Sequence, residues 1–125
     1  MIYDGAFVGK NKKNIVCELR CWLGRKVLLH KSTLLGHVVR LHLDSAFVVD
    51  ALKRNFHTPI CVKKNVRNDT LNAYYDINTG GQPFLLVAVQ IVSRVARIAG
   101  KDHFIKTFYG VDSLPPGPYE WERKQ

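Results

Sequence analysis

The residues closest to a possible chemistry in this sequence are two histidines, His37 and His42. They lie five positions apart in a stretch whose apolar residues recur at helical spacing. Five residues turn a helix by about 500°, so the two rings point about 140° apart and cannot share one metal ion. His37 lies at the edge of the apolar arc, where a helix leaves its sheet, which suits acid–base chemistry near neutral pH. His42 lies inside the arc, and both a structural and a functional role stay open for it.

Hydroxyl groups come from a predicted strand near the end of the chain. His103 to Tyr109 alternates in polarity. The alternation predicts one face with Ile105, Thr107 and Tyr109 and another with Phe104, Lys106 and Phe108. Thr107 also has a structural interpretation as an ordinary strand former, and Tyr109 as a core residue with its hydroxyl at the rim.

The charge of the chain favours a polyanionic partner. Nineteen Lys and Arg against ten Asp and Glu give +9 over 125 residues. Such an excess is typical of proteins that bind phosphate-rich partners, although a solubilising surface is an alternative. RNA contacts are expected from Lys63, Lys64, Arg67, Arg94, Arg97 and Lys106. No segment has the two faces of an interfacial helix, and no apolar run approaches the roughly 20 residues of a membrane helix, so no membrane partner is expected.

The sequence lacks the motifs of several common kinds of functional site. There is no Gly-rich phosphate loop, no nucleophile elbow and no pair of carboxylates at useful spacing. Because acids are scarce, a metal-dependent nuclease is disfavoured, and we expect no metal and no cofactor. Cys17, Cys21 and Cys61 are an odd set at irregular spacing, which predicts buried structural thiols rather than a zinc site or disulfides. Free thiols and the lack of a signal-peptide pattern predict a cytoplasmic protein.

The remaining polar groups, His, Thr, Tyr and Lys/Arg, suffice to cleave RNA without a metal. A base takes the proton of the ribose 2′-hydroxyl, whose oxygen attacks the adjacent phosphate. An acid then protonates the leaving 5′-oxygen, while cations stabilise the developing charge. DNA lacks the 2′-hydroxyl, so this chemistry selects RNA.

The pattern of elements predicts an α+β fold. We expect two helices on one face of an antiparallel sheet of about four strands, with an N-terminal strand pair and an extended Pro-rich tail that cannot join the sheet. The helices begin at Ser32 or Thr33 and at Asp44-Ser45, the second running to about Asn55. The strands are expected at Asn14–Leu19, Lys26–His30, Ile60–Lys64, Leu71–Ile77, Phe84–Val92 and His103–Tyr109. Three regions follow: a basic arm and strand (1–25), an α+β domain (26–112) and the tail (113–125).

The stretch from Val27 to His42, VLLHKSTLLGHVVRLH, resembles the opening of phage- and mobile-element-associated nuclease domains of the barnase/EndoU/colicin/RelE-like (BECR) class. The likeness continues through Thr58-Pro59-Ile60, the Tyr74-Tyr75 strand and the closing Thr107-Phe-Tyr109. It implies a metal-independent endoribonuclease, often a toxin that a partner holds in check. His37, His42 and Thr107 are the matching positions, and Tyr109 matches less specifically.

The leading hypothesis is therefore a small toxin-like endoribonuclease. His37 would act as base or acid, with His42 as its counterpart or positioner, and Thr107 and Tyr109 would hold the phosphate. Its partners would be RNA and an acidic inhibitor or antitoxin protein. The alternatives are a non-catalytic basic RNA- or ribosome-binding module and a phage or mobile-element protein bound to an acidic partner.

Overall fold

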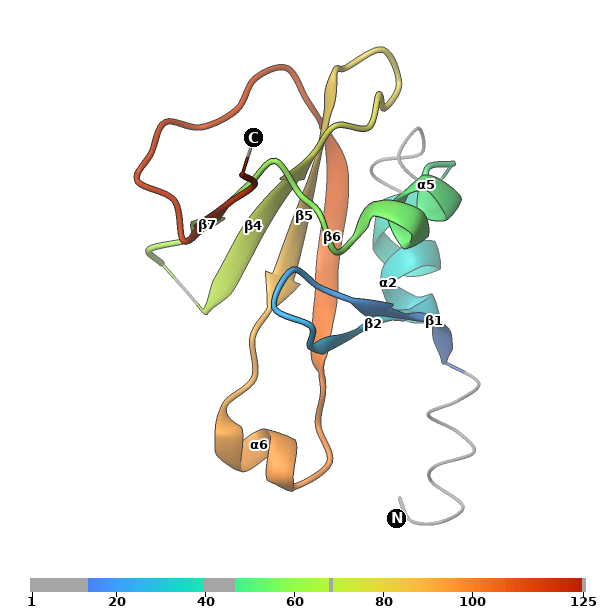
Figure 1. Ribbon diagram of the computed structural model, residues 1–125. Coiled ribbons are helices and arrows are strands. Elements are labelled where there is room, and N and C mark those ends of the chain that lie inside the picture. The colour runs from blue at the N-terminus through green and yellow to red at the C-terminus, as the bar shows by residue number, and fades with distance from the viewer. Residues whose placement is uncertain (1–13, 40–46, 68, 125) are drawn as a thin grey trace.

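A seven-stranded mixed sheet organises the molecule (Figure 1). The computed structural model describes residues 14–39, 47–67 and 69–124. Their elements are β1 (Ile15–Arg20), β2 (Lys26–His30), α2 (Lys31–Thr33), the π-helix η1 (Leu34–Val38), α5 (Val49–Asn55), β3 (Cys61–Lys64), β4 (Thr70–Tyr75), β5 (Phe84–Gln90), α6 (Arg94–Ile98), β6 (His103–Val111) and β7 (Trp121–Glu122). The sheet order is β1-β2-β6-β5-β4-β3-β7. The α+β class is thus confirmed.

The centre of the sheet is the antiparallel meander β3 to β6 that the alternation predicts. In β5 every residue from Leu85 to Val89 is buried, as expected for a continuous run of apolar strand formers with neighbours on both sides. In β4, Ala73 and Tyr75 point to one face and Tyr74 to the other. The strand pattern therefore gives the layers of the fold correctly.

The sheet has more strands than the expected four, for two reasons. The β1–β2 hairpin joins it because β2 pairs in parallel with β6, Val27 lying opposite His103. At the other edge Trp121 pairs with Val62, so β7 extends the sheet beyond β3. The expectation that the tail cannot join a sheet is wrong for these last residues, because the prolines that prevent pairing end at Pro118.

The first helix differs from its prediction at the start. It begins at Lys31, with His30 as the N-cap residue and no side-chain cap. The hydroxyl of Thr33, expected to cap the helix, donates instead to the carbonyl oxygen of Ile105 at 3.3 Å. The predicted start of the second helix and His42 lie outside the described residues, whereas α5 ends at Asn55 as predicted.

The helix α6 was not expected at all. It lies in the long connection from β5 to β6 and is capped by Ser93, whose hydroxyl accepts a hydrogen bond from the backbone N–H of Ala96 at 3.1 Å. A turn follows it, with Gly100 at a φ of +96°, a conformation that favours glycine. None of the described helices is long and apolar enough to cross a membrane.

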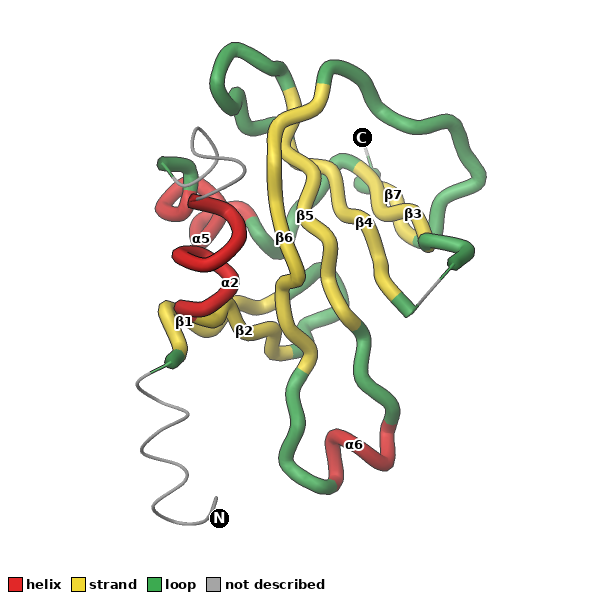
Figure 2. Tube along the Cα trace, turned by 180° about the vertical axis from the view of Figure 1, so that it is seen from behind, coloured by secondary structure: helices red, strands yellow, loops and turns green. Residues whose placement is uncertain are grey.

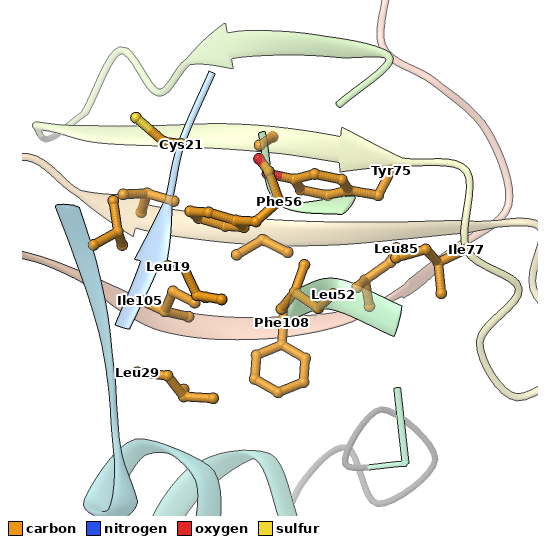
Figure 3. Close-up of a cluster of buried hydrophobic side chains, with 14 of the residues drawn as sticks. Leu19, Cys21, Leu29, Leu52, Phe56, Tyr75, Ile77, Leu85, Ile105 and Phe108 are labelled. Carbon is orange, nitrogen blue, oxygen red and sulfur yellow. The ribbon is translucent and has the colours of Figure 1, made fainter. Parts of the chain in front are cut away.

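The two faces of the sheet are covered very differently. The helices η1 and α5 and the β1–β2 hairpin lie over one face, here called the covered face, whose core includes Phe56, Tyr75 and Phe108 (Figure 3). The rings of Phe56 and Tyr75 stack with centroids 5.8 Å apart, and the Tyr75 hydroxyl donates to the Phe56 carbonyl at 2.9 Å. On the opposite, open face no described helix lies in front of β4, β5 or β6 (Figure 2). Its small cluster consists of Cys61, Tyr74, Leu86 and Ala88.

Candidate functional site

A β-bulge in β6 decides where the predicted site residues point. Thr107 lies opposite Ala88, but the next pair along β5 is Val89 with Ile105, so Lys106 is an additional residue without a partner. Bulges re-aim side chains and are common next to active sites. The single alternation predicted for His103 to Tyr109 is therefore wrong. Ile105 lies in the core of the covered face, while Thr107 points to the open face.

Beyond the bulge the strand is regular again. Phe108 points into the covered core, and Tyr109 lies opposite Leu86 on the open face, half-buried against its cluster. Thr107 and Tyr109, the two predicted hydroxyl-bearing residues, thus share the open face, whereas Ile105 lies on the covered face. Burial raises the pKa of the Tyr74 phenol, and the neighbouring phenol of Tyr109 raises it further. The Tyr74 phenol is therefore a neutral donor at physiological pH.

The helix segment α2–η1 runs beside β6, in the same direction along the sheet (Figure 1). The hydrogen bond from Thr33 to the Ile105 carbonyl fixes their relative height. From this hydrogen bond, His37 lies four residues further along the helix segment and Thr107 two residues further along β6, so both follow it in the same direction.

The burial of the helix shows which side faces the strand. Leu35 and Gly36 are exposed, whereas Thr33 and His37 are half-buried and Val38 is fully buried in the covered core. Thr33 and His37 lie four positions apart, so they share the side that contacts β6. The residues of η1 form a π-helix, a rare conformation that occurs frequently at functional sites. His37 is part of it.

The hydroxyl of Thr107 is unusual for a strand residue. Its Oγ1 is buried and has no hydrogen-bond partner among the residues that the structure describes. A buried hydroxyl without a partner costs on the order of 1–3 kcal/mol, so most proteins satisfy or remove it. Its persistence beside a bulge and a π-helix marks this seam between η1 and β6 as the candidate site. Here the structure brings His37 and Thr107 onto adjoining elements.

The six cations predicted to contact RNA do not form one patch. Lys106 is exposed beside Thr107 at the bulge. Lys63 donates to the Pro116 carbonyl of the tail, and its neighbours Lys64 and Arg67 are exposed in the β3–β4 hairpin. The remaining two, Arg94 and Arg97, are exposed on α6. Of the six, Lys106 alone flanks the seam within the described chain.

Sequence reasoning named Arg94 and Arg97 as RNA contacts but missed the basic end of the molecule to which they belong. It joins the turn between β1 and β2 to the α6 connection and carries the cations Arg25, Lys26, Arg94, Arg97 and Lys101. Lys26 forms an ion pair with Asp102 at 3.5 Å. The Arg-Val-Ala-Arg spacing of α6 was the available signal, but only the parallel pairing of β2 with β6 brings the two segments together.

His103 lies buried at this basic end, 2% exposed. Its Nδ1 accepts from the backbone N–H of Val92 at 3.0 Å, so the proton of the neutral ring is on Nε2. Burial lowers the pKa of His103, the guanidinium groups of Arg97 and Arg25 lower it further, and Asp102 opposes them. The ring is thus neutral at pH 7 and has a structural role.

The cysteines are free thiols, two of them buried and Cys17 half-buried. Burial is the main cause that raises the pKa of Cys17 and of Cys61, which makes both thiols poor nucleophiles. No group of three or more metal-ligating side chains occurs within residues 14–39, 47–67 and 69–124.

No protein-family model matches the chain, and no curated protein or solved structure does either. The geometry of the seam is therefore the basis for assigning a function.

Proposed function

We propose that the chain is a metal-independent endoribonuclease, toxin-like and of the BECR class, with its active site at the seam between η1 and β6. The observation that carries the proposal is the packing of η1, which bears His37, beside β6, which bears Thr107 with a buried hydroxyl that lacks a partner in the described part of the chain. A residue that exchanges protons and a donor for a phosphate oxygen are the first requirements of RNA cleavage by the 2′-hydroxyl.

The roles follow from chemistry and position. His37 takes the proton of the 2′-hydroxyl or gives one to the leaving 5′-oxygen. The hydroxyls of Thr107 and Tyr109 donate to the phosphate, and the ammonium group of Lys106 stabilises the charge that develops there. His42, outside the described residues, keeps its predicted role as counterpart or positioner.

The test is cleavage of a labelled RNA in EDTA by the wild type and by two histidine variants. We expect His37→Ala to lower the rate by at least 100-fold, the usual contribution of a positioned acid or base. His57→Ala is the matched control, because His57 is an exposed residue that follows α5 and has no role in the proposed site. A His37→Ala variant that cuts at the wild-type rate would remove the assignment.

A second candidate is a non-catalytic RNA- or ribosome-binding module, which the basic end favours. Its exposed cations offer phosphate contacts without any catalytic group. In the same assay this module would bind RNA in a salt-sensitive way and leave it intact, with or without His37.

The basic end also suits an acidic inhibitor or other acidic partner. Val95 and Ile98 are 77% and 80% exposed, and each directly follows an arginine of α6. Apolar groups surrounded by cations are what an acidic protein surface complements. Co-purification of an acidic protein, combined with no affinity for RNA, would favour this partner as the main function.

A further inference from the structure

A pocket of about 340 Å³ opens at the junction of β2, β6 and the α6 connection, below the seam. Leu28, His30 and Phe104 line it from the two strands, and Gly100, Lys101 and Asp102 from the connection. The volume lies in the range of small-ligand sites, which are mostly apolar with a few convergent polar groups. Of these residues, Lys101 also belongs to the basic end, and the others have no role in the functions proposed above.

The pocket belongs to the open face. Val27 and Leu29 point into the covered core, so Leu28 between them points the other way. Ile105 is likewise in the covered core, and Phe104 before it lies on the open side, paired in register with Leu28. The pocket and Thr107 therefore lie on the same face of the molecule.

Two rings form the inner surface of the pocket. Phe104 is only half-buried, although it is a large apolar residue in the middle of a sheet. Its ring centroid is 5.8 Å from that of His30, with 57° between the planes, so the two rings are tilted against each other and do not stack. A partly exposed aromatic ring in the same pocket as the ammonium group of Lys101 can stack with a flat ligand.

The polar groups at the rim define the ligand further. Lys101 is exposed and supplies a positive charge. The Asp102 carboxylate, paired with Lys26 at 3.5 Å, adds a hydrogen-bond acceptor. A flat ring with N–H donors, attached to a negatively charged backbone, satisfies both groups, and this is the chemistry of a nucleotide.

The distance to the seam fits a neighbouring nucleotide. Phe104 and Thr107 lie opposite Gln90 and Ala88, which are two residues apart on β5, about 7 Å along a strand. We propose that the pocket binds one unpaired base of a single-stranded RNA, stacked on Phe104, next to the phosphate that lies at Thr107. This inference rests on RNA as the substrate of the proposed function, but not on its cleavage.

Binding can be measured apart from cleavage with a 2′-O-methylated RNA oligonucleotide that carries 2-aminopurine. This probe has no free 2′-hydroxyl, so attack on the phosphate is blocked, and its fluorescence falls when the base stacks. We expect quenching with the wild type and with Phe104→Tyr. Phe104→Leu should lose the quenching and weaken binding roughly 5- to 150-fold, the usual worth of one stacked base.

Phe84→Leu is the matched control, since Phe84 is also half-buried on the open face but lies at the far end, opposite Val111. It should bind like the wild type. If Phe104→Leu binds and quenches like the wild type, or if Phe84→Leu weakens binding equally, the pocket is not the base site.

A surface variant covers the case in which Phe104→Leu fails to fold. Lys101→Glu changes an exposed residue, and it should weaken binding and reduce the slope of log affinity against log salt by about 1. Lys124→Glu is its control. Equal effects of both would overturn the pocket. A wild type that quenches the probe but never cuts RNA would reject the proposed nuclease and keep the base site.

Discussion

Neighbouring residues of strand β6 lie in two different environments. Phe108 and Ile105 are completely buried on the covered face, in a core that the helices and the β1–β2 hairpin complete. Thr107 and Tyr109, on the same strand, stay half-buried on the open face, and one of their hydroxyls is buried without a partner in the described structure.

The difference separates stability from function within one strand. The covered face is apolar, and its Tyr75 hydroxyl is satisfied by the Phe56 carbonyl. On the open face, Tyr109 packs against a smaller hydrophobic cluster, and Thr107 lies opposite Ala88, a member of that cluster. Substitutions of fully buried residues on the covered face should therefore unfold the protein, whereas substitutions of the half-buried Thr107 and Tyr109 should cost less stability.

The largest expected effect is on Phe108. Phe108→Ala should lower the free energy of unfolding by about 3–5 kcal/mol, because it removes a large side chain from the closed core. The adjacent Tyr109→Ala should cost clearly less, since Tyr109 is half-buried. Urea denaturation of both variants gives the two values, and similar losses would remove the distinction between the faces.

Thr107→Val tests the open face, and here we expect the free energy of unfolding to rise rather than fall. The variant keeps the shape and replaces a buried hydroxyl that has no partner among the described residues, so the free energy of unfolding should rise by about 1 kcal/mol. The rate of RNA cleavage should fall at the same time. Urea denaturation and single-turnover cleavage measure the two effects. A variant that is less stable and equally active would show a purely structural threonine.

Thr33→Val examines how the helix is held at the strand. It removes the hydrogen bond to the Ile105 carbonyl, which should cost about 0.5–1.5 kcal/mol and also lower cleavage through misplacement of His37. Ser32→Ala, one residue earlier and exposed, serves as the comparison. Equal stability and cleavage rates in the two variants would mean that this bond does not align the seam.

The smallest effect concerns pH. Burial lowers the pKa of His103 below the usual 6.5, so below that pH the unfolded chain binds more protons than the folded one. The free energy of unfolding should therefore fall as pH drops below about 6.5. His103→Asn retains an acceptor for the Val92 N–H and should weaken this dependence. Parallel pH series of denaturant melts would show it, and identical slopes would contradict the assignment.

Local patterns in the sequence predict the central strands and the α+β class well. Periodicity reports burial, and the apolar run of β5 or the alternation of β4 states directly which faces are covered. What local patterns do not contain is pairing between distant segments. The parallel contact of Val27 with His103 and the pairing of Trp121 with Val62 depend on the whole fold.

The candidate site was predictable in its residue types but not in its geometry. His37 and Thr107 follow from helix and strand patterns, whereas the bulge at Lys106 breaks the alternation and leaves no local signal. The pocket at Phe104 was missed for another reason, because the residues that line it lie far apart in the sequence.

The short strand β7 has a consequence for association between molecules. It occupies the outer hydrogen-bonding groups of β3, with Cys61 opposite Glu122, and so shields an edge that neighbouring chains would otherwise extend. Shortening the protein by the residues after Ser113 would expose that edge and favour intermolecular sheet growth. The tail thus opposes aggregation, although it lies outside the meander that forms the centre of the sheet.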